Sequence, residues 1–308
     1  MYSDKKIVIV GATGLIGREL VQHLNANHYQ ILVITRRGLK AKKLFGEGIT
    51  IIEWHDHNRI AEAVNGALAV VNLAGESIAG YWSKSKRERI LSSRVSATNL
   101  LVEKILSCNN PPLVLVQASA IGYYHHNSDE RINETASKGD GFLSDVVERW
   151  EGAAKPVEKL TRVVYIRTGI VLSRQGGFIQ SIKIPVKFFL GNWFGNGSQM
   201  VSWIHLADHI RAIGFVIENR SCSGAFNLVA PDPVPFRVLM KKMGHHLHRP
   251  VYLSFPAVLV KLFFGRMAEE VLLANQNVQP DRLLHSGFNF RYPEIDSALN
   301  DLFHQVDV

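Results

Sequence analysis

Short, unbroken apolar runs alternate with amphipathic segments along the first half of the chain. Residues 7–10 (Ile-Val-Ile-Val) and 31–34 (Ile-Leu-Val-Ile) have the length and composition of buried parallel strands. After the first run, Leu20, Val21 and Leu24 recur at helical spacing. This alternation predicts an α/β fold with a doubly wound parallel sheet. We expect strands at 7–10, 31–34, 49–54, 69–73, 113–117 and 163–167, and helices at 60–64, 84–107 and 148–160.

The second half of the chain is looser. Glycine pairs or clusters interrupt it at 176–177 and 191–197, and the second cluster, with its interleaved aromatic residues, predicts a substrate-side lid or a crossover. A helix over 205–218 and a strand over 225–229 are expected to return to the sheet. Helices dominate from Pro235 onward. There, five apolar residues at helical spacing predict core or a subunit contact, with a membrane-surface role as the alternative: Phe255, Val258, Leu259, Leu262 and Phe263.

Composition excludes several classes of protein. The 308 residues are 46% hydrophobic and 20% charged, which excludes a wholly disordered or fibrous chain. The chain starts without an apolar signal segment, and its longest lipophilic stretch, 251–264, is too short to span a bilayer. We therefore expect a cytoplasmic protein without a membrane span. The net charge of +8 is divided among three separate clusters, at 36–43, 84–89 and 241–249, so nucleic-acid binding is not expected.

The thiol and imidazole groups do not form a recognisable framework. Cys108 and Cys222 are the only cysteines and lie far apart in the sequence, which fits a reducing compartment without requiring one. His245, His246 and His248 cluster without a nearby cysteine or carboxylate, so we expect a surface loop there and no metal site.

A glycine-rich turn follows the first strand and precedes the first helix. Gly11 permits a tight turn, Gly14 leaves room for the backbone to approach a pyrophosphate, and Gly17 lets the helix pack closely on the sheet. The N-terminus of the following helix offers free N–H groups to the anion. The turn therefore predicts a dinucleotide site, whose candidate residues here are Gly11, Thr13, Gly14, Leu15, Ile16 and Gly17.

The end of the second strand indicates which dinucleotide binds. NAD sites usually carry a carboxylate there for the ribose 2′-hydroxyl, but this chain has Arg36 and Arg37 after Thr35. Because guanidinium groups bind a 2′-phosphate, we predict that NADP(H) is favoured over NAD(H), with a surface role for Arg37 as the alternative. Trp54, at the end of the third strand, is a candidate for adenine packing or for the core.

The chain resembles the extended short-chain dehydrogenase/reductases over almost its whole length. The resemblance rests on the glycine turn, on Asn-Leu-Ala-Gly-Glu at 72–76, on Ser119 with Tyr123, on Arg-Thr-Gly-Ile-Val-Leu at 167–172, and on Trp-Ile-His at 203–205 with Asp208. It is closest to an atypical branch, the YfcH-like NAD-dependent epimerase family, some of whose members carry the label of a SulA-type cell-division inhibitor homologue.

The resemblance implies a domain division and further cofactor contacts. We expect a Rossmann-type, NADP-binding core over 1–172, with its sheet completed by part of 200–230, and substrate-side loops with a small, mainly helical C-terminal domain over 173–308. Some extended members dimerise through two long helices, here near 84–107 and 148–160, so a homodimer is expected by analogy. The further cofactor-binding candidates are Leu73, Ala74, Gly75, Glu76, Arg94 and Arg167, with a buried ion pair as the alternative for Arg167.

The usual catalytic pair of the superfamily is missing. Ser119 matches the serine that orients the substrate, but residues 141–148 contain neither the tyrosine nor the lysine of Tyr-x-x-x-Lys. Tyr123 is the candidate substitute acid, with Arg94 as a neighbour able to lower a phenol pKa, or it is an aromatic that lines the nicotinamide pocket. Two functions remain open: an NADP-dependent oxidoreductase or epimerase with an atypical active site and an unknown small-molecule substrate, or a catalytically degenerate NADPH sensor that acts through partners.

Overall fold

Seven parallel strands form the central sheet of the computed structural model, which describes residues 5–188 and 191–304. Their order in the sheet is β12-β7-β5-β4-β1-β2-β3. The strands are β1 (Lys6–Val10), β2 (Gln30–Thr35), β3 (Thr50–Glu53), β4 (Ala69–Asn72), β5 (Val114–Ala120), β7 (Arg162–Thr168) and β12 (Gly224–Leu228). The predicted doubly wound α/β sheet is confirmed, and β12 completes it at one edge by pairing with β7.

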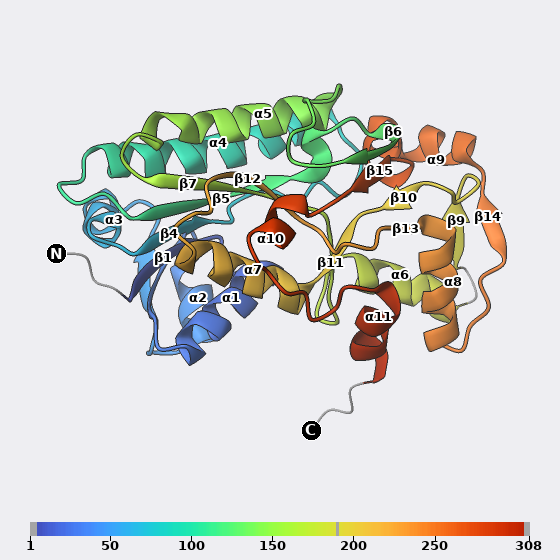
Figure 1. Ribbon diagram of the computed structural model, residues 1–308, viewed down its shortest axis with the longest axis horizontal. Helices are drawn as coiled ribbons and strands as arrows, with labels where there is room; N and C mark the ends of the chain where they lie inside the picture. Colours follow the sequence, from blue (N-terminus) through green and yellow to red (C-terminus); the bar gives the residue numbers. More distant parts are fainter. Residues whose placement is uncertain (1–4, 189–190, 305–308) are drawn as a thin grey trace.

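Helices cover both faces of the sheet, as Figure 1 shows. On one face lie α3 (His57–Val64), α4 (Lys84–Leu106) and α5 (Phe142–Ala154), and on the other α1 (Leu15–Ala26), α2 (Gly38–Phe45) and α7 (Leu206–Glu218). Successive side chains of a strand point to opposite faces, and β1 shows the result. Ile7 and Ile9 pack with the core under α1 and α7, whereas Val8 and Val10 pack with the core under α3 and α4.

The C-terminal part lies beside the carboxyl ends of the strands, at the right of Figure 1. Its helices are α6 (Phe178–Lys187), α8 (Phe236–His246), α9 (Ala257–Phe264), α10 (Asp281–His285) and α11 (Ile295–His304), with a π-helical turn at Ala268–Leu272. Short strand pairs connect it: β8 (Ile170–Leu172) with β11 (Trp203–His205), β9 (Asn192–Phe194) with β14 (Leu253–Phe255), β10 (Met200–Val201) with β13 (Val234–Pro235), and β6 (Asn127–Ile132) with β15 (Asn275–Val278).

Asp208 ties the C-terminal segment to the sheet domain. Its buried carboxylate accepts hydrogen bonds from the backbone N–H groups of Arg291, at 2.9 Å, and Tyr292, at 2.7 Å. The Tyr292 hydroxyl in turn donates to Asp301 of α11 at 2.6 Å. A charged, fully buried carboxylate is stable only with such partners, so Asp208 holds this junction in one arrangement.

Several predicted elements differ from the structure. The helix expected at 148–160 is α5, which begins and ends six residues earlier, and a short 3-10 turn, Lys155–Val157, follows it. The cluster 191–197 is not a free lid, since β9 within it pairs with β14. His245 and His246 end α8 instead of lying in a loop. No described helix has both the length and the apolar character that crossing a membrane requires.

The apolar stripe predicted to be core or a subunit contact is largely exposed. Val258, Leu262 and Phe263 of α9 are 76%, 75% and 61% exposed, and Val260 is the buried residue of this helix. The core interpretation is wrong because α9 lies at the periphery of the molecule (Figure 1), whereas a subunit contact stays a prediction.

Candidate functional site

The glycine turn has the close backbone contacts that its sequence predicts. Gly11 has a φ of +82°, and a Cβ atom on it would lie 2.6 Å from the carbonyl carbon of Leu73. A Cβ atom on Gly17 would lie 2.5 Å from the carbonyl oxygen of Gly11. Gly14 is different: the nearest atom to its Cβ position is 3.4 Å away, and the residue is exposed. Two glycines therefore build the turn, and the third leaves its outer side open.

The N-terminus of α1 is available for an anion. Gly14 is its N-cap residue, no described side chain caps the helix, and its first turn carries no acidic residue. The Arg18 side chain donates to the carbonyl of Thr13 at 3.1 Å and so fixes the turn. Leu15 faces Gly177 of the loop before α6, and Ile16 packs on the core. Free N–H groups and the helix dipole both favour a pyrophosphate at this position.

Arg36 and Arg37, the residues predicted to bind a 2′-phosphate, directly follow β2. Both are exposed after β2, and Arg37 is the N-cap residue of α2, whose first turn also lacks acidic residues. A negative charge near these arginines, on Glu53, was not predicted from the sequence. A carboxylate oxygen of Glu53 lies 2.5 Å from the position that a Cβ atom on Gly38 would take. Trp54 is half-buried against the α3–α4 core and keeps part of its surface outward. The two positive charges of Arg36 and Arg37 outnumber the one negative charge of Glu53, so the end of β2 keeps a net positive charge.

The segment after β4 joins the glycine turn to Arg94 of α4. The Arg94 guanidinium donates to the carbonyls of Glu76, at 3.0 Å, and Ile90, at 2.9 Å, and would touch any Cβ atom placed on Gly75. Burial lowers the pKa of Arg94 to about 10. Lys86 binds the Glu76 carboxylate at 3.0 Å, and this hydrogen bond holds the pKa of Glu76 below its usual value. The carboxyl edge of the sheet thus brings together five of the predicted cofactor residues: Leu73, Ala74, Gly75, Glu76 and Arg94.

A buried polar network stands behind this edge. Glu151 of α5 pairs with Arg167 through two hydrogen bonds of 2.9 Å, and the Ser119 hydroxyl donates to Glu151 at 2.6 Å. Arg167 also donates to the Tyr124 hydroxyl, which donates to Asn227 at 2.7 Å. Sequence reasoning missed Glu151, for which the only signal was an acidic residue on an otherwise apolar helix face.

This network corrects two predictions. Arg167 is 5% exposed, with its guanidinium held by Glu151 and Tyr124, so it forms the buried ion pair that was the alternative to a cofactor contact. The cation beside the phenols is Arg167 and not Arg94: its Cζ atom lies 3.6 Å from the centre of the Tyr123 ring. Arg167 favours the ionised form of the Tyr124 phenol, but burial outweighs this effect and raises the pKa of Tyr124 to about 12. Neither Ser119 nor Tyr123 lines the cavity described next.

A cavity of about 620 Å³ lies between the carboxyl edge of the sheet and the C-terminal part. The sheet domain contributes Arg94, the turn at 120–122 and Thr168 to its wall. The part of α5 that would carry Tyr-x-x-x-Lys in typical members presents only apolar or aromatic side chains to it: Leu143, Val146, Val147 and Trp150. This volume suits a small organic molecule, and the wall is unlike that of an ordinary reductase of this type.

Thr168 on the cavity wall contacts a buried histidine. Its Oγ1 atom lies 2.9 Å from Nε2 of His209, a fully buried residue of α7 whose Nδ1 has no partner among the described residues. Burial lowers the pKa of His209 to about 3, so the imidazole is neutral at physiological pH. The sequence offered no sign of this pair, because the two residues are 41 positions apart.

The buried His209 predicts a pH-dependent stability. Its folded pKa, about 3, is below the unfolded value of 6.5, so its contribution is complete above pH 6.5 and is lost as the pH falls toward 3. Between pH 7 and pH 5 we expect the wild type to lose about 2 kcal/mol more unfolding free energy than His209→Leu. Denaturant titrations at both pH values measure this difference. Equal losses in the two proteins would show that the imidazole is accessible to protons in the folded state.

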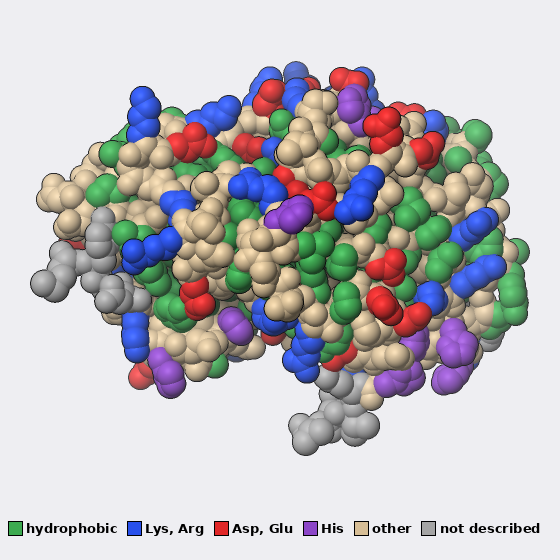
Figure 2. All heavy atoms as spheres, viewed as in Figure 1, with side chains coloured by type: hydrophobic (Ala, Val, Ile, Leu, Met, Phe, Trp, Pro, Cys, Tyr) green, Lys and Arg blue, Asp and Glu red, His purple; other side chains and the backbone are tan. Residues whose placement is uncertain are grey.

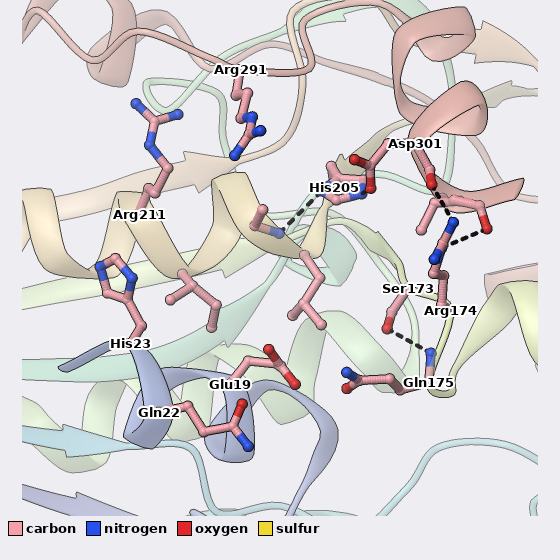
Figure 3. A pocket seen from close by; sticks show the side chains of 14 residues that line it. Glu19, Gln22, His23, Ser173, Arg174, Gln175, His205, Arg211, Arg291 and Asp301 are labelled. Atoms are coloured by element: carbon pink, nitrogen blue, oxygen red, sulfur yellow. Dashed lines mark hydrogen bonds and ion pairs between the residues drawn. The ribbon is translucent and has the colours of Figure 1, made fainter. Parts of the chain in front are cut away.

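A second hollow, of about 600 Å³, lies between α1, α7 and α11 (Figure 3). Glu19, Gln22 and His23 project into it from α1, opposite Arg211 of α7 and Arg291. Beside them, Arg174 donates to the carbonyls of Asp301, at 2.7 Å, and Leu302, at 2.8 Å. None of the predicted cofactor residues lines this hollow. Its contacts join α11 to the sheet domain.

The charged side chains are mixed on the surface. On the face shown in Figure 2, Lys and Arg alternate with Asp and Glu, and no continuous basic stripe crosses it. Among the described residues no cluster of histidine, cysteine, aspartate and glutamate has the arrangement of a metal site.

The strand order and the glycine turn define a class of protein, the extended, dinucleotide-binding dehydrogenase/reductase fold. Residues 7–140 match the NAD dependent epimerase/dehydratase family, and residues 255–302 match a domain of unknown function, DUF1731. Epimerase family protein SA0724 of Staphylococcus aureus is 34% identical over 303 residues, which cover 98% of this chain and 100% of that protein. The chain belongs to this epimerase family, an NAD(P)-binding family, and the predicted YfcH-like resemblance is confirmed.

Solved structures agree with this assignment. The human epimerase family protein SDR39U1, crystallised with NADPH, is 30% identical and superposes with a TM-score of 0.87 over 98% of this chain and 100% of that chain. A nucleoside-diphosphate sugar epimerase from Corynebacterium glutamicum is 29% identical, with a TM-score of 0.76 over 98% of this chain and 59% of that chain.

Proposed function

We propose that this protein binds NADPH at the glycine turn and uses it as an oxidoreductase. The observation that carries the proposal is the free N-terminus of α1, at the open side of Gly14, with Arg36 and Arg37 at the end of the neighbouring strand. The human relative crystallised with NADPH supports the choice of cofactor. In this proposal the protein is cytoplasmic, and the homodimer through α4 and α5 remains a prediction.

The chain's own residues would hold the cofactor and shape the reaction site. When bound, NADPH supplies a hydride to a carbonyl carbon while a proton from solvent joins the oxygen, which yields NADP⁺ and an alcohol. Arg94 is the charged group that lies between the cofactor edge and the cavity, where it can face an anionic or carbonyl oxygen. We assign positioning roles to Ser119 and Tyr123, because the first is bonded to Glu151 and the second supports the Arg167 guanidinium.

A second candidate is an NADPH-binding sensor without turnover. The observation that favours it is the apolar face of α5, which presents Leu143, Val146 and Val147 where a proton-donating pair would be expected. Single-turnover oxidation of NADPH in the presence of a panel of aldehydes and ketones separates the two candidates. Substrate-dependent loss of NADPH absorbance supports the oxidoreductase, and its absence with every compound, at saturating NADPH, supports the sensor.

Arg36→Ala tests the cofactor assignment. Since a charge-assisted hydrogen bond contributes about 1.5–3 kcal/mol, we expect the variant to bind NADPH roughly tenfold to a hundredfold more weakly and NADH unchanged. Thermal shift and titration calorimetry with both cofactors measure this. The matched control is Arg149→Ala, which removes an exposed arginine on α5. Equal weakening in both variants, or no NADPH binding by the wild type, would overturn the assignment.

A further inference from the structure

The wall of the cavity is apolar on nearly every side. Side chains from α4, α5, α6 and the C-terminal part converge on it, and most of them are aliphatic, aromatic or thioether groups. They include Ile90, Leu143, Trp150, Phe178, Phe236 and Met267. Such a wall gains free energy by burying apolar ligand surface and offers little to a hydroxylated one.

Two polar side chains of the wall, Gln276 and Ser202, use hydrogen-bonding groups within the protein. The Gln276 amide donates to the carbonyls of Ile121 and His125, each at 3.1 Å. The Ser202 hydroxyl donates to the carbonyl of Gln276 at 2.7 Å and accepts from the N–H of Val278 at 2.9 Å. These groups are therefore not available to a sugar, whose several hydroxyls each require a partner when buried.

The charged groups of the wall are also engaged. Glu270 accepts hydrogen bonds from the N–H groups of Phe142, at 3.0 Å, and Leu143, at 2.8 Å. Arg94 is bound to two carbonyls and lies over the Trp150 ring, with its Cζ atom 4.9 Å from the ring centre. They are the two charged residues among the described lining residues, one of each sign. A nucleotide sugar would bring two phosphate charges into a wall with no net positive charge.

We propose that the cavity binds a neutral ligand with an apolar body, and that the substrate is a hydrophobic aldehyde or ketone and not a nucleotide-linked sugar. The inference rests on the proposed function, because the carbonyl is what a bound NADPH would reduce. The apolar body fills the space between α5 and α6, and Arg94 is the polar group near the cofactor edge. The cavity volume of about 620 Å³ accommodates a ligand of two or more fused rings, or a long alkyl chain.

The test uses prodan, a neutral naphthyl ketone whose fluorescence shifts to the blue in apolar surroundings. We expect the full-length protein to bind it, with and without NADPH, and Ile182→Asp to weaken binding about tenfold or more by placing a carboxylate on the cavity wall. The matched control is Ile184→Asp on the same helix, at a position that is 62% exposed and does not line the cavity. UDP-glucose is expected neither to bind nor to displace prodan.

The outcomes separate this inference from the proposed function. If prodan does not bind, if Ile184→Asp weakens it as much as Ile182→Asp, or if UDP-glucose displaces it, the inference is wrong. NADPH binding is followed in parallel by thermal shift. NADPH binding without prodan binding contradicts the ligand class alone, whereas prodan binding without NADPH binding contradicts the proposed function and leaves the apolar site in place.

Discussion

Gly17→Ala is expected to disrupt the fold around the cofactor turn, whereas Gly14→Ala is expected to remove NADPH binding from a folded protein. A methyl group on Gly17 would stand 2.5 Å from the Gly11 carbonyl oxygen and 2.6 Å from Cα of Ala12. These are backbone atoms of a tight turn, so α1 must move away from the sheet, at a cost of about 1–3 kcal/mol of unfolding free energy. NADPH binding is lost with the displaced helix.

Gly14 provides the matched comparison. Its backbone is extended, with φ −78° and ψ 174°, which alanine adopts without strain, and its Cβ position meets no atom closer than 3.4 Å. We therefore expect Gly14→Ala to unfold at the wild-type denaturant concentration or slightly above it, while its methyl group hinders the approach of the pyrophosphate. Denaturant unfolding and NADPH titration of both variants measure the two effects. Unimpaired NADPH binding by Gly14→Ala would place the pyrophosphate elsewhere.

Glu151→Ala is expected to be the most destabilising single substitution of a polar residue, at about 3–5 kcal/mol. Burial opposes the charge of Arg167, but the hydrogen bonds and the charge of Glu151 raise the pKa of this guanidinium above its ordinary value. Removing Glu151 leaves that charge buried and also removes the acceptor of the Ser119 hydroxyl. Chemical denaturation monitored by tryptophan fluorescence gives the free energy of unfolding.

Two further variants test whether the effect of Glu151→Ala comes from the unpaired charge of Arg167. Glu148→Ala, one turn earlier on α5, removes a solvent-exposed partner of Lys138 and is expected to cost at most about 1 kcal/mol. The double variant Glu151→Leu with Arg167→Met removes both charges and is expected to recover most of the lost stability, because no unpaired ion remains. If the double variant is as unstable as Glu151→Ala, the loss is one of packing and not of an uncompensated charge.

The strands and the cofactor turn were the most predictable parts of this protein. The runs at 7–10, 31–34 and 69–73 form β1, β2 and β4 to within one residue at each end, because buried parallel strands need continuous apolar stretches. Gly17 is likewise required by a contact with Gly11 and Ala12, only a few residues before it in the chain. Such local requirements are written in consecutive positions, so a single sequence reveals them.

The helix bounds were predicted less well where a distant residue fixes a helix end. The helix expected at 148–160 is α5, but α5 begins at Phe142, where Glu270 accepts hydrogen bonds from the N–H groups of its first turn. That capping carboxylate is more than 120 residues away in the sequence. The start of α5, and with it the residues that α5 presents to the cavity, therefore depends on a tertiary contact.

By itself the sequence determined the α/β class, the dinucleotide turn and the arginines at the end of β2, since each follows from local backbone geometry or from adjacent side chains. Only the tertiary structure decided that Arg167 pairs with Glu151, that the stripe on α9 is exposed, and that an apolar cavity adjoins Arg94. Burial, charge compensation and cavity shape arise where distant segments meet, and no pattern along the chain specifies which segments those are.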